Sequence, residues 1–238
     1  MNINDMYQIC QYAINKAQNG YLTPDNFNLL ANQAQTSYQD YLLGEFQQYQ
    51  VGRPQARVNY SQNSDTRQRM APFLKEVTLS INTDGIALYP DDYLQADAVL
   101  TSTFDRVRFI QQDSLYSYLK SEIDPIATNP VYLLANVSST YTDGGLQFYP
   151  KTLGSAILSY VMNAPTMVWA YTLDGNGRPV FAPTQTGSGV YPTTGTVEPL
   201  WYDIDKLEIV ARILKLVGVN LQDGQVEQYA NMVTTQGQ

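Results

Sequence analysis

The sequence predicts an α+β protein with an N-terminal helical hairpin, a central antiparallel β-sandwich or partial barrel, and two C-terminal helices. Two observations lead to this class. Apolar residues recur every three or four positions at both ends of the chain, as they do on one face of a helix. Between residues 73 and 172 the apolar period falls to two, which is typical of strands. No helix alternates regularly with these strands, so the sheet is expected to be antiparallel.

Residues 1–49 are expected to form the helical hairpin. Gly20 is suited to end the first helix, and Thr23 followed by Pro24 is suited to start the second, with a hydroxyl cap and a proline in the first turn. The apolar face of the first helix comprises Ile3, Met6, Cys10, Ala13, Ile14 and Ala17. That of the second comprises Phe27, Leu30, Ala31, Ala34, Tyr38, Tyr41 and Leu42.

Residues 50–72 interrupt the helical spacing and are expected to form an extended arm or long loop. A short stretch holds five of the 14 cationic residues: Arg53, Arg57, Arg67, Arg69 and Lys75. An arm that contacts acidic surfaces of a partner is one interpretation, and Pro54, Tyr60 and Pro72 favour such an extended strand. A solvated loop with scattered charges is the other. The charge density is too low to favour binding of DNA.

The β domain is expected to span residues 73–172. Its strands are predicted around Val77–Ile81 and at Ile86–Tyr89, Gln95–Thr101, Arg106–Gln111, Val131–Ser138, Gln147–Tyr149, Ala156–Met162 and Met167–Thr172, with a short helix at Ser114–Ser121. Residues 173–202 are rich in Gly, Pro and Thr and predict a hairpin tip and a long surface loop.

Residues 203–238 are expected to form two helices that pack with the N-terminal hairpin. The first has apolar residues at Leu207, Val210, Ala211, Leu214 and Val217, and the second at Val226, Tyr229, Ala230 and Val233.

The composition points towards binding rather than chemistry. The chain has no histidine and 19 tyrosines among 238 residues. Without imidazole there is no Ser/His/Asp or Cys/His nucleophile system and no histidine-containing metal site. Tyrosine suits interfaces that are both packed and wet, and the 15% of charged residues is low, as at interface cores. We therefore expect no enzymatic activity, no cofactor and no metal.

Charge, cysteine content and hydropathy limit the partners and the cellular compartment that we expect for this protein. The net charge of −8 disfavours sequence-independent binding of nucleic acid. The single cysteine, Cys10, allows no intrachain disulfide and is expected to be a buried small hydrophobe rather than a reactive thiol. No apolar run approaches the roughly 20 residues that span a bilayer, and the N-terminus does not resemble a signal peptide. Synthesis in the cytoplasm is expected.

Several acidic and aromatic motifs have a functional and a structural interpretation. Asp91-Asp92 could supply two carboxylates for glycoside hydrolysis, but neighbours on a strand point to opposite faces, so turn chemistry after Pro90 is favoured. Asp203 and Asp205 are expected to cap a helix. Asp174–Gly177 resembles the start of a calcium loop but lacks the later ligands, so a hairpin turn is favoured. The tyrosines, together with Trp169 and Trp201, could line a sugar-binding groove, but packing at an interface is favoured.

Several short motifs occur in an order that resembles a known family. They are Asn15–Asn28 with Ala31–Gln35, Arg53–Arg57, Tyr89–Tyr93, Tyr149-Pro150, Tyr160–Tyr171, Ile213–Leu221 and Gln228–Ala230. In this order the chain resembles virion structural ring or adaptor proteins of the head–tail connector in crAss-like and related Bacteroidetes-infecting tailed phages. The resemblance covers most of the chain apart from the loop Asp174–Pro199. Each motif is short and made of common residues, so the specificity comes from their order.

The resemblance implies a virion protein of the phage neck or tail, made in the bacterial host cytoplasm. It implies a non-enzymatic subunit of a cyclic, dodecameric homo-oligomer around the DNA channel, in contact with the portal and with neighbouring ring and tail proteins. Packaged DNA would pass through without specific binding, and no membrane is involved. The alternative is a carbohydrate-binding or host-contact module of a phage tail. The candidate interface residues are Arg53, Arg57, Tyr60, Arg67, Arg69 and Trp201.

Overall fold

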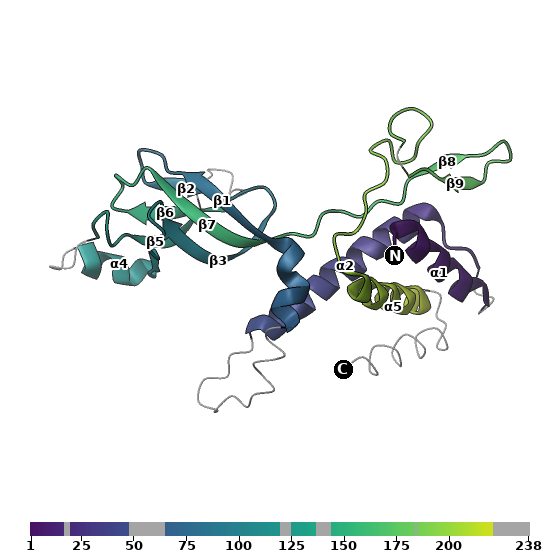
Figure 1. Cartoon of the computed structure of the whole chain (residues 1–238), viewed down its shortest axis with the longest axis horizontal. Helices are drawn as coiled ribbons and strands as arrows, with labels where there is room; N and C mark the ends of the chain where they lie inside the picture. Colours follow the sequence, from purple (N-terminus) through teal and green to yellow (C-terminus); the bar gives the residue numbers. More distant parts are fainter. Residues whose placement is uncertain (17–19, 48–64, 120–124, 137–143, 184, 221–238) are drawn as a thin grey trace, which may run out of the picture. The chain divides into compact units, whose positions relative to one another are not determined.

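The chain forms two compact units in the computed structural model, which describes residues 1–16, 20–47, 65–119, 125–136, 144–183 and 185–220 (Figure 1). Unit 1 combines Met1–Pro72 with Ala164–Gln238, and unit 2 is Phe73–Asn163. Helices dominate the first unit and antiparallel sheets the second, which confirms the α+β class. The β unit starts at the residue expected from the sequence but ends before residue 172.

Three long helices build unit 1: α1 (Ile3–Lys16), α2 (Pro24–Gln47) and α5 (Asp203–Asn220). Both N-terminal helices pack on α5, so the two ends of the described chain share one core (Figure 1). Thr23 caps α2 as predicted, because its Oγ1 accepts a hydrogen bond from the Asn26 N–H and its carbonyl accepts one from the Phe27 N–H. The second predicted C-terminal helix falls on residues 221–238, outside the described residues.

Side-chain amides of α2 hold the extended segment 164–169. Asn28 accepts from the Trp169 N–H at 2.7 Å and donates to the Trp169 carbonyl at 3.1 Å, and Asn32 makes the same pair of bonds with Met167 at 2.8 Å each. Gln35 donates to the Pro165 carbonyl, and Gln39 accepts from the Ala164 N–H. We call these four residues, spaced along one face of α2, the amide ladder.

The amide ladder explains why the predicted strand Met167–Thr172 is not part of the β domain. The segment is extended, but its backbone groups pair with helix side chains on one edge and, at Val168, with Val197 on the other. Only Tyr171–Leu173 forms a strand, β8, which pairs antiparallel with β9 (Pro179–Phe181). The turn between them is the predicted hairpin turn, since Asp174 Oδ1 accepts from the backbone N–H groups of Asn176 and Arg178.

The end of the predicted arm is helical rather than extended. Residues 65–70 form a helical turn, followed by the short helix η1 (Ala71–Phe73). Thr66 and Met70, four residues apart, are buried, and Asp65 and Arg69 form an ion pair at 2.9 Å. The expectation of an extended arm over residues 65–72 is therefore wrong. The buried side chains of Thr66 and Met70 lie on one face of a helix, although the sequence around them has little apolar spacing. Residues 50–64 lie outside the described residues.

Unit 2 contains two sheets. In the first, β7 (Ser155–Met162) lies between β1 (Leu74–Ser80) and β3 (Tyr93–Thr101), antiparallel to both. In the second, the order is β2 (Ile86–Leu88), β6 (Gly144–Tyr149), β5 (Val131–Asn136) and β4 (Arg108–Phe109). Among the described strands no closed barrel forms.

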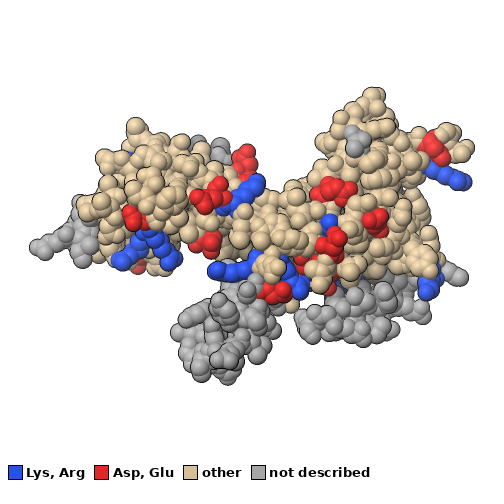
Figure 2. Space-filling view, viewed as in Figure 1, with Lys and Arg blue, Asp and Glu red and all other residues tan. Residues whose placement is uncertain are grey.

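One strand pair departs from the antiparallel prediction. β4 runs parallel to β5, because the chain between them includes helix α4 (Gln112–Leu119) and is long enough for a crossover. Ile110 and Leu115 pack there against Val131 and Leu133 of β5. Alternate residues of β7 and β6 are also buried, among them Ala156, Leu158, Leu146 and Phe148. The face shown in Figure 2 is mostly uncharged, and several of its basic and acidic residues lie next to one another.

Candidate protein–protein interface at the start of α5

Residues 198–207 of unit 1 alternate between anchored side chains and exposed apolar ones. Pro199, Trp201 and Asp205 are buried, whereas Leu200, Tyr202, Ile204 and Leu207 are exposed. This pattern is unusual, because a polar carboxyl group points inward and large apolar groups point to solvent.

Trp201 anchors the segment from within. Its indole Nε1–H donates to Gln35 Oε1 at 3.1 Å, and its ring packs against Tyr38 with 5.0 Å between centroids. Only 2% of Trp201 is exposed. Gln35 thus belongs to the amide ladder on one side and binds Trp201 on the other, which connects the start of α5 to α2.

Asp205 is the second anchor. The carboxyl group is fully buried, and Oδ1 accepts from the Tyr38 hydroxyl at 2.7 Å and from Arg69 Nη1 at 3.3 Å. Among the described residues Oδ2 has no hydrogen-bond partner. Burial raises the pKa of Asp205, although the bonds from Tyr38 and Arg69 act in the opposite direction. Burial and the bond to Asp205 raise the pKa of Tyr38.

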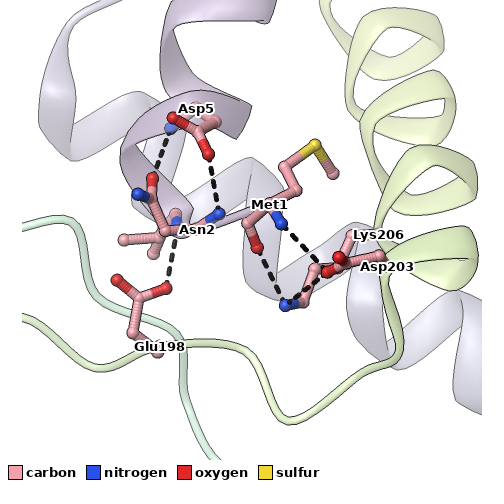
Figure 3. A network of polar contacts seen from close by, with 7 residues as sticks. Met1, Asn2, Asp5, Glu198, Asp203 and Lys206 are labelled. Atoms are coloured by element: carbon pink, nitrogen blue, oxygen red, sulfur yellow. Dashed lines mark hydrogen bonds and ion pairs between the residues drawn. The ribbon is translucent and has the colours of Figure 1, made fainter.

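A polar network around Met1 is the third anchor (Figure 3). The α-ammonium group of Met1 lies 3.0 Å from Asp203 Oδ1, and Lys206 Nζ donates to the Met1 carbonyl at 2.8 Å. Glu198 accepts from the Ile3 N–H at 2.8 Å, while Asn2 and Asp5 exchange hydrogen bonds. These contacts tie the segment before α5 to the start of α1.

We call the exposed apolar side chains at the start of α5 the α5 apolar face: Leu200, Tyr202, Ile204 and Leu207, which are 47%, 48%, 64% and 57% exposed. Ile204 and Leu207 are three residues apart and therefore share one side of the helix. Because the backbone beneath is anchored at three places, a partner that covers this face has little main-chain freedom to remove. The arrangement can therefore bind an apolar protein surface.

The structure places the predicted site residues differently. Arg53, Arg57 and Tyr60 lie outside the described residues. Arg67 is exposed on the helix 65–70, and Arg69 is engaged with Asp65, Tyr38 and Asp205. Trp201 was expected at an interface, but its burial removes it from the surface. The structure brings Arg69 and Trp201 together at Tyr38.

The α5 apolar face was not predicted from the sequence. Leu207 was assigned to the buried face of the last helix, and the structure shows it exposed. Ile204, three residues earlier, was the available signal, because the two residues together define a second apolar direction on α5. The expectation that Cys10 is buried is confirmed, and burial raises its pKa to about 12.

The other acidic motifs have structural partners. The turn after Pro90 is confirmed by a hydrogen bond from the Tyr93 N–H to the Pro90 carbonyl, and Asp92 binds Lys75 and Tyr160. Asp203 and Asp205 lie in the first turn of α5, as expected for carboxylates near a helix start. The expected cap is not what they form, because Asp203 binds Met1 and Lys206, and Asp205 binds Tyr38 and Arg69.

No group of three or more Cys, Asp or Glu side chains in the described part of the chain could hold a metal ion. No helix among the described residues is long and apolar enough to cross a membrane.

Comparison with known proteins gives no assignment: no family model matches the chain, and no curated protein is significantly similar to it.

Proposed function

We propose that this chain is a non-enzymatic structural subunit of a phage head–tail connector, which oligomerises around the DNA channel and joins the portal to the tail. The observation that carries the proposal is the α5 apolar face, four exposed apolar side chains on an anchored backbone. A subunit of a closed ring needs such a patch, since each copy must contact its neighbours. The order of the sequence motifs supports the phage setting, the dodecameric ring, and the portal and tail as partners.

Within this proposal we treat unit 2 as a two-sheet sandwich. The alternate burial along β7 and β6 supports this arrangement, because each sheet then turns one apolar face inward. The basic residues Arg53 and Arg57, with Tyr60, remain candidates for contacts with neighbouring rings.

The alternative, a carbohydrate-binding or host-contact module, was based on exposed aromatic side chains, the tyrosines together with the two tryptophans. Trp169 and Trp201 are each only 2% exposed, so neither offers a face to a sugar ring in this structure. Trp169 is instead stacked against Tyr171 and Phe181 and in tilted contact with Tyr7. We therefore favour the connector subunit.

The proposal is tested by quantitative mass spectrometry on purified, nuclease-treated phage particles. We expect near-equal numbers of this chain and of the portal subunit. Particles that are infectious without the protein would refute the connector role, and several-fold fewer copies would indicate a peripheral fibre.

The α5 apolar face is tested with the double substitution Ile204→Asp and Leu207→Asp. Both side chains are exposed, so the folded chain should lose less than about 0.5 kcal/mol of stability. We expect tailless particles that lack the protein. The matched control is Leu134→Asp, an equally exposed leucine on β5, 60% exposed, which should assemble normally. Normal incorporation of the double variant would remove this face from the interface.

A further inference from the structure

A second apolar surface lies at the other end of α5. A shallow pocket of about 190 Å³ opens between α1, the start of α2 and the last turns of α5. Apart from Asn26, the described residues that line it are apolar or aromatic. Tyr21 and Leu29 are 59% and 68% exposed, whereas the other four are buried: Ile14, Leu22, Leu30 and Val217. We call this surface the α1–α2 groove.

Hydrogen bonds hold the groove in shape. The Tyr7 hydroxyl donates to the Leu22 carbonyl at 3.1 Å, and Gln11 Nε2 donates to the same carbonyl. The hydroxyl groups of Tyr7 and Tyr21 lie 3.3 Å apart. The connection between α1 and α2, which forms one wall, is therefore tied to α1. A partner that enters the groove has little backbone freedom to remove.

The size and lining of the groove indicate what it binds. Its 190 Å³ is below the roughly 300–1,000 Å³ of most small-molecule sites, and few polar groups line it. A pocket of this kind suits a large apolar side chain from another protein surface. Such anchors carry most of the binding energy at protein–protein interfaces.

The α5 apolar face offers side chains of this kind, but it cannot reach the groove of its own chain. Ile204 lies at the start of α5, and Val217, which lines the groove, lies near its end. At 3.6 residues per turn, their side chains point in directions about 140° apart and lie about 20 Å apart along the helix. Two complementary surfaces so placed form a head-to-tail contact between copies, which can close into a ring.

The charged side chains beside the two surfaces favour the same pairing. Within two residues of the groove lining, two basic side chains and one acidic side chain are exposed: Lys16, Lys215 and Asp25. Within two residues of the α5 apolar face, three acidic side chains and one basic side chain are exposed or half-buried: Glu198, Asp203, Glu208 and Lys206. Acidic groups outnumber basic ones there even when the α-ammonium group of Met1, which binds Asp203, is included. Opposite signs steer two surfaces together.

We propose that the α5 apolar face of one copy docks in the α1–α2 groove of the next copy, with Ile204 and Leu207 against Tyr21 and Leu29. The inference rests on the proposed function, because it names the surface that the α5 apolar face contacts within the ring.

Disulfide trapping in purified phage particles tests the docking. When every copy carries both Leu29→Cys and Ile204→Cys, mild oxidation should link each copy to the next and give a ladder of covalent oligomers on a non-reducing gel. Each single variant should give no ladder. The matched control combines Ile204→Cys with Leu173→Cys, an exposed leucine of β8 that does not line the groove, and should give none either. The native Cys10 is fully buried and does not interfere.

The outcomes separate this inference from the proposed function. If the chain is present in near-equal numbers to the portal subunit but the double variant gives no ladder, the docking is wrong and the connector role stands. Covalent dimers from Ile204→Cys alone would show that two α5 apolar faces meet, which also overturns the docking. If particles lack the wild-type chain, the proposed function fails and the docking fails with it.

A charge exchange gives an independent measurement. Leu29→Asp should lower incorporation into particles at least about tenfold, because it places a carboxylate against the apolar side chains of the next copy. Adding Ile204→Lys should restore most of the incorporation, since the two new charges attract each other. Adding Ile204→Asp instead should not. Unchanged incorporation of Leu29→Asp, or a loss that Ile204→Lys does not relieve, would overturn the docking.

Discussion

Each of the two units contains an aspartate bound by a tyrosine and a basic residue. The pKa values of the two aspartates are shifted in opposite directions from the ordinary value. In unit 1 Asp205 accepts from Tyr38 and Arg69. In unit 2 Asp92 accepts from Lys75 at 2.5 Å and from Tyr160 at 2.8 Å. The bonds from Lys75 and Tyr160 lower the pKa of Asp92, whereas burial raises the pKa of Asp205.

Because the partners are alike, the difference in burial accounts for the opposite directions of the two pKa shifts. The side chain of Asp92 is 37% exposed, so water still solvates its charge. The hydrogen bonds from Lys75 and Tyr160 therefore stabilise the ionised form further. Asp205 is fully buried, and in the part of the chain that the structure describes only one of its oxygens has hydrogen-bond partners. Desolvation destabilises its ionised form by more than the hydrogen bonds from Tyr38 and Arg69 stabilise it. A buried carboxyl group of this kind anchors the start of α5 at a cost in stability.

Removing each aspartate should give the largest contrast. We expect Asp205→Ala to destabilise unit 1 by about 3–5 kcal/mol, because it leaves the buried Tyr38 hydroxyl and Arg69 without their shared acceptor. Asp92→Ala should cost less than about 1 kcal/mol, since its ion pair is exposed. Both tryptophans lie in unit 1, so tryptophan fluorescence during urea unfolding reports on that unit, and far-UV circular dichroism covers both. Equal costs for the two substitutions would contradict the argument from burial.

The amide ladder should be the next most sensitive feature of unit 1. Asn32→Ala removes the partners of both the N–H and the carbonyl of Met167, a fully buried residue, and is expected to cost about 2–4 kcal/mol. Ser159→Ala on β7 is the control, because the backbone of that strand pairs with its neighbours and does not need the side chain. Urea denaturation measures both. A loss below about 0.5 kcal/mol for Asn32→Ala would show that the segment is held by other contacts.

The smallest and most specific effect is the dependence on pH. The folded pKa of Asp205 is above the unfolded value of about 3.9, so protonation stabilises the fold, and its ionised form lowers stability as pH rises through the folded pKa. The folded pKa of Asp92 is below that value, so its contribution is present at neutral pH and is lost as pH falls.

Two substitutions separate these contributions. Relative to the wild type, Asp205→Asn should become less favourable as the pH is lowered from neutral, and Asp92→Asn should become more favourable. The nearby charges of Asp65, Arg69 and Arg212 remain in both cases. Urea unfolding over a series of pH values gives the two slopes, and slopes of the same sign would refute the comparison.

Local patterns predicted much of this fold and little of the candidate site. The helical spacing placed α1, α2 and α5, and the period of two placed β1, β3 and β7, because each pattern reflects one element with one buried face. The sequence could not show that Gln35 and Gln39 are buried, since their partners lie about 130 residues away along the chain. The same limit applies to Leu207, whose spacing fits the buried stripe although no element among the described residues covers it.

The sequence by itself determined the types of the elements, their approximate limits, and the chemistry that is excluded when a chain has no histidine. The types and limits of the elements depend on neighbours within a few residues, and the excluded chemistry depends on composition alone. Only the tertiary structure decided which groups meet. It joined segment 164–169 to α2 rather than to a sheet, buried Trp201 and Asp205, and left Ile204 and Leu207 exposed. A backbone N–H accepts any well-placed oxygen as a partner, and which oxygen is well placed depends on how the helices pack.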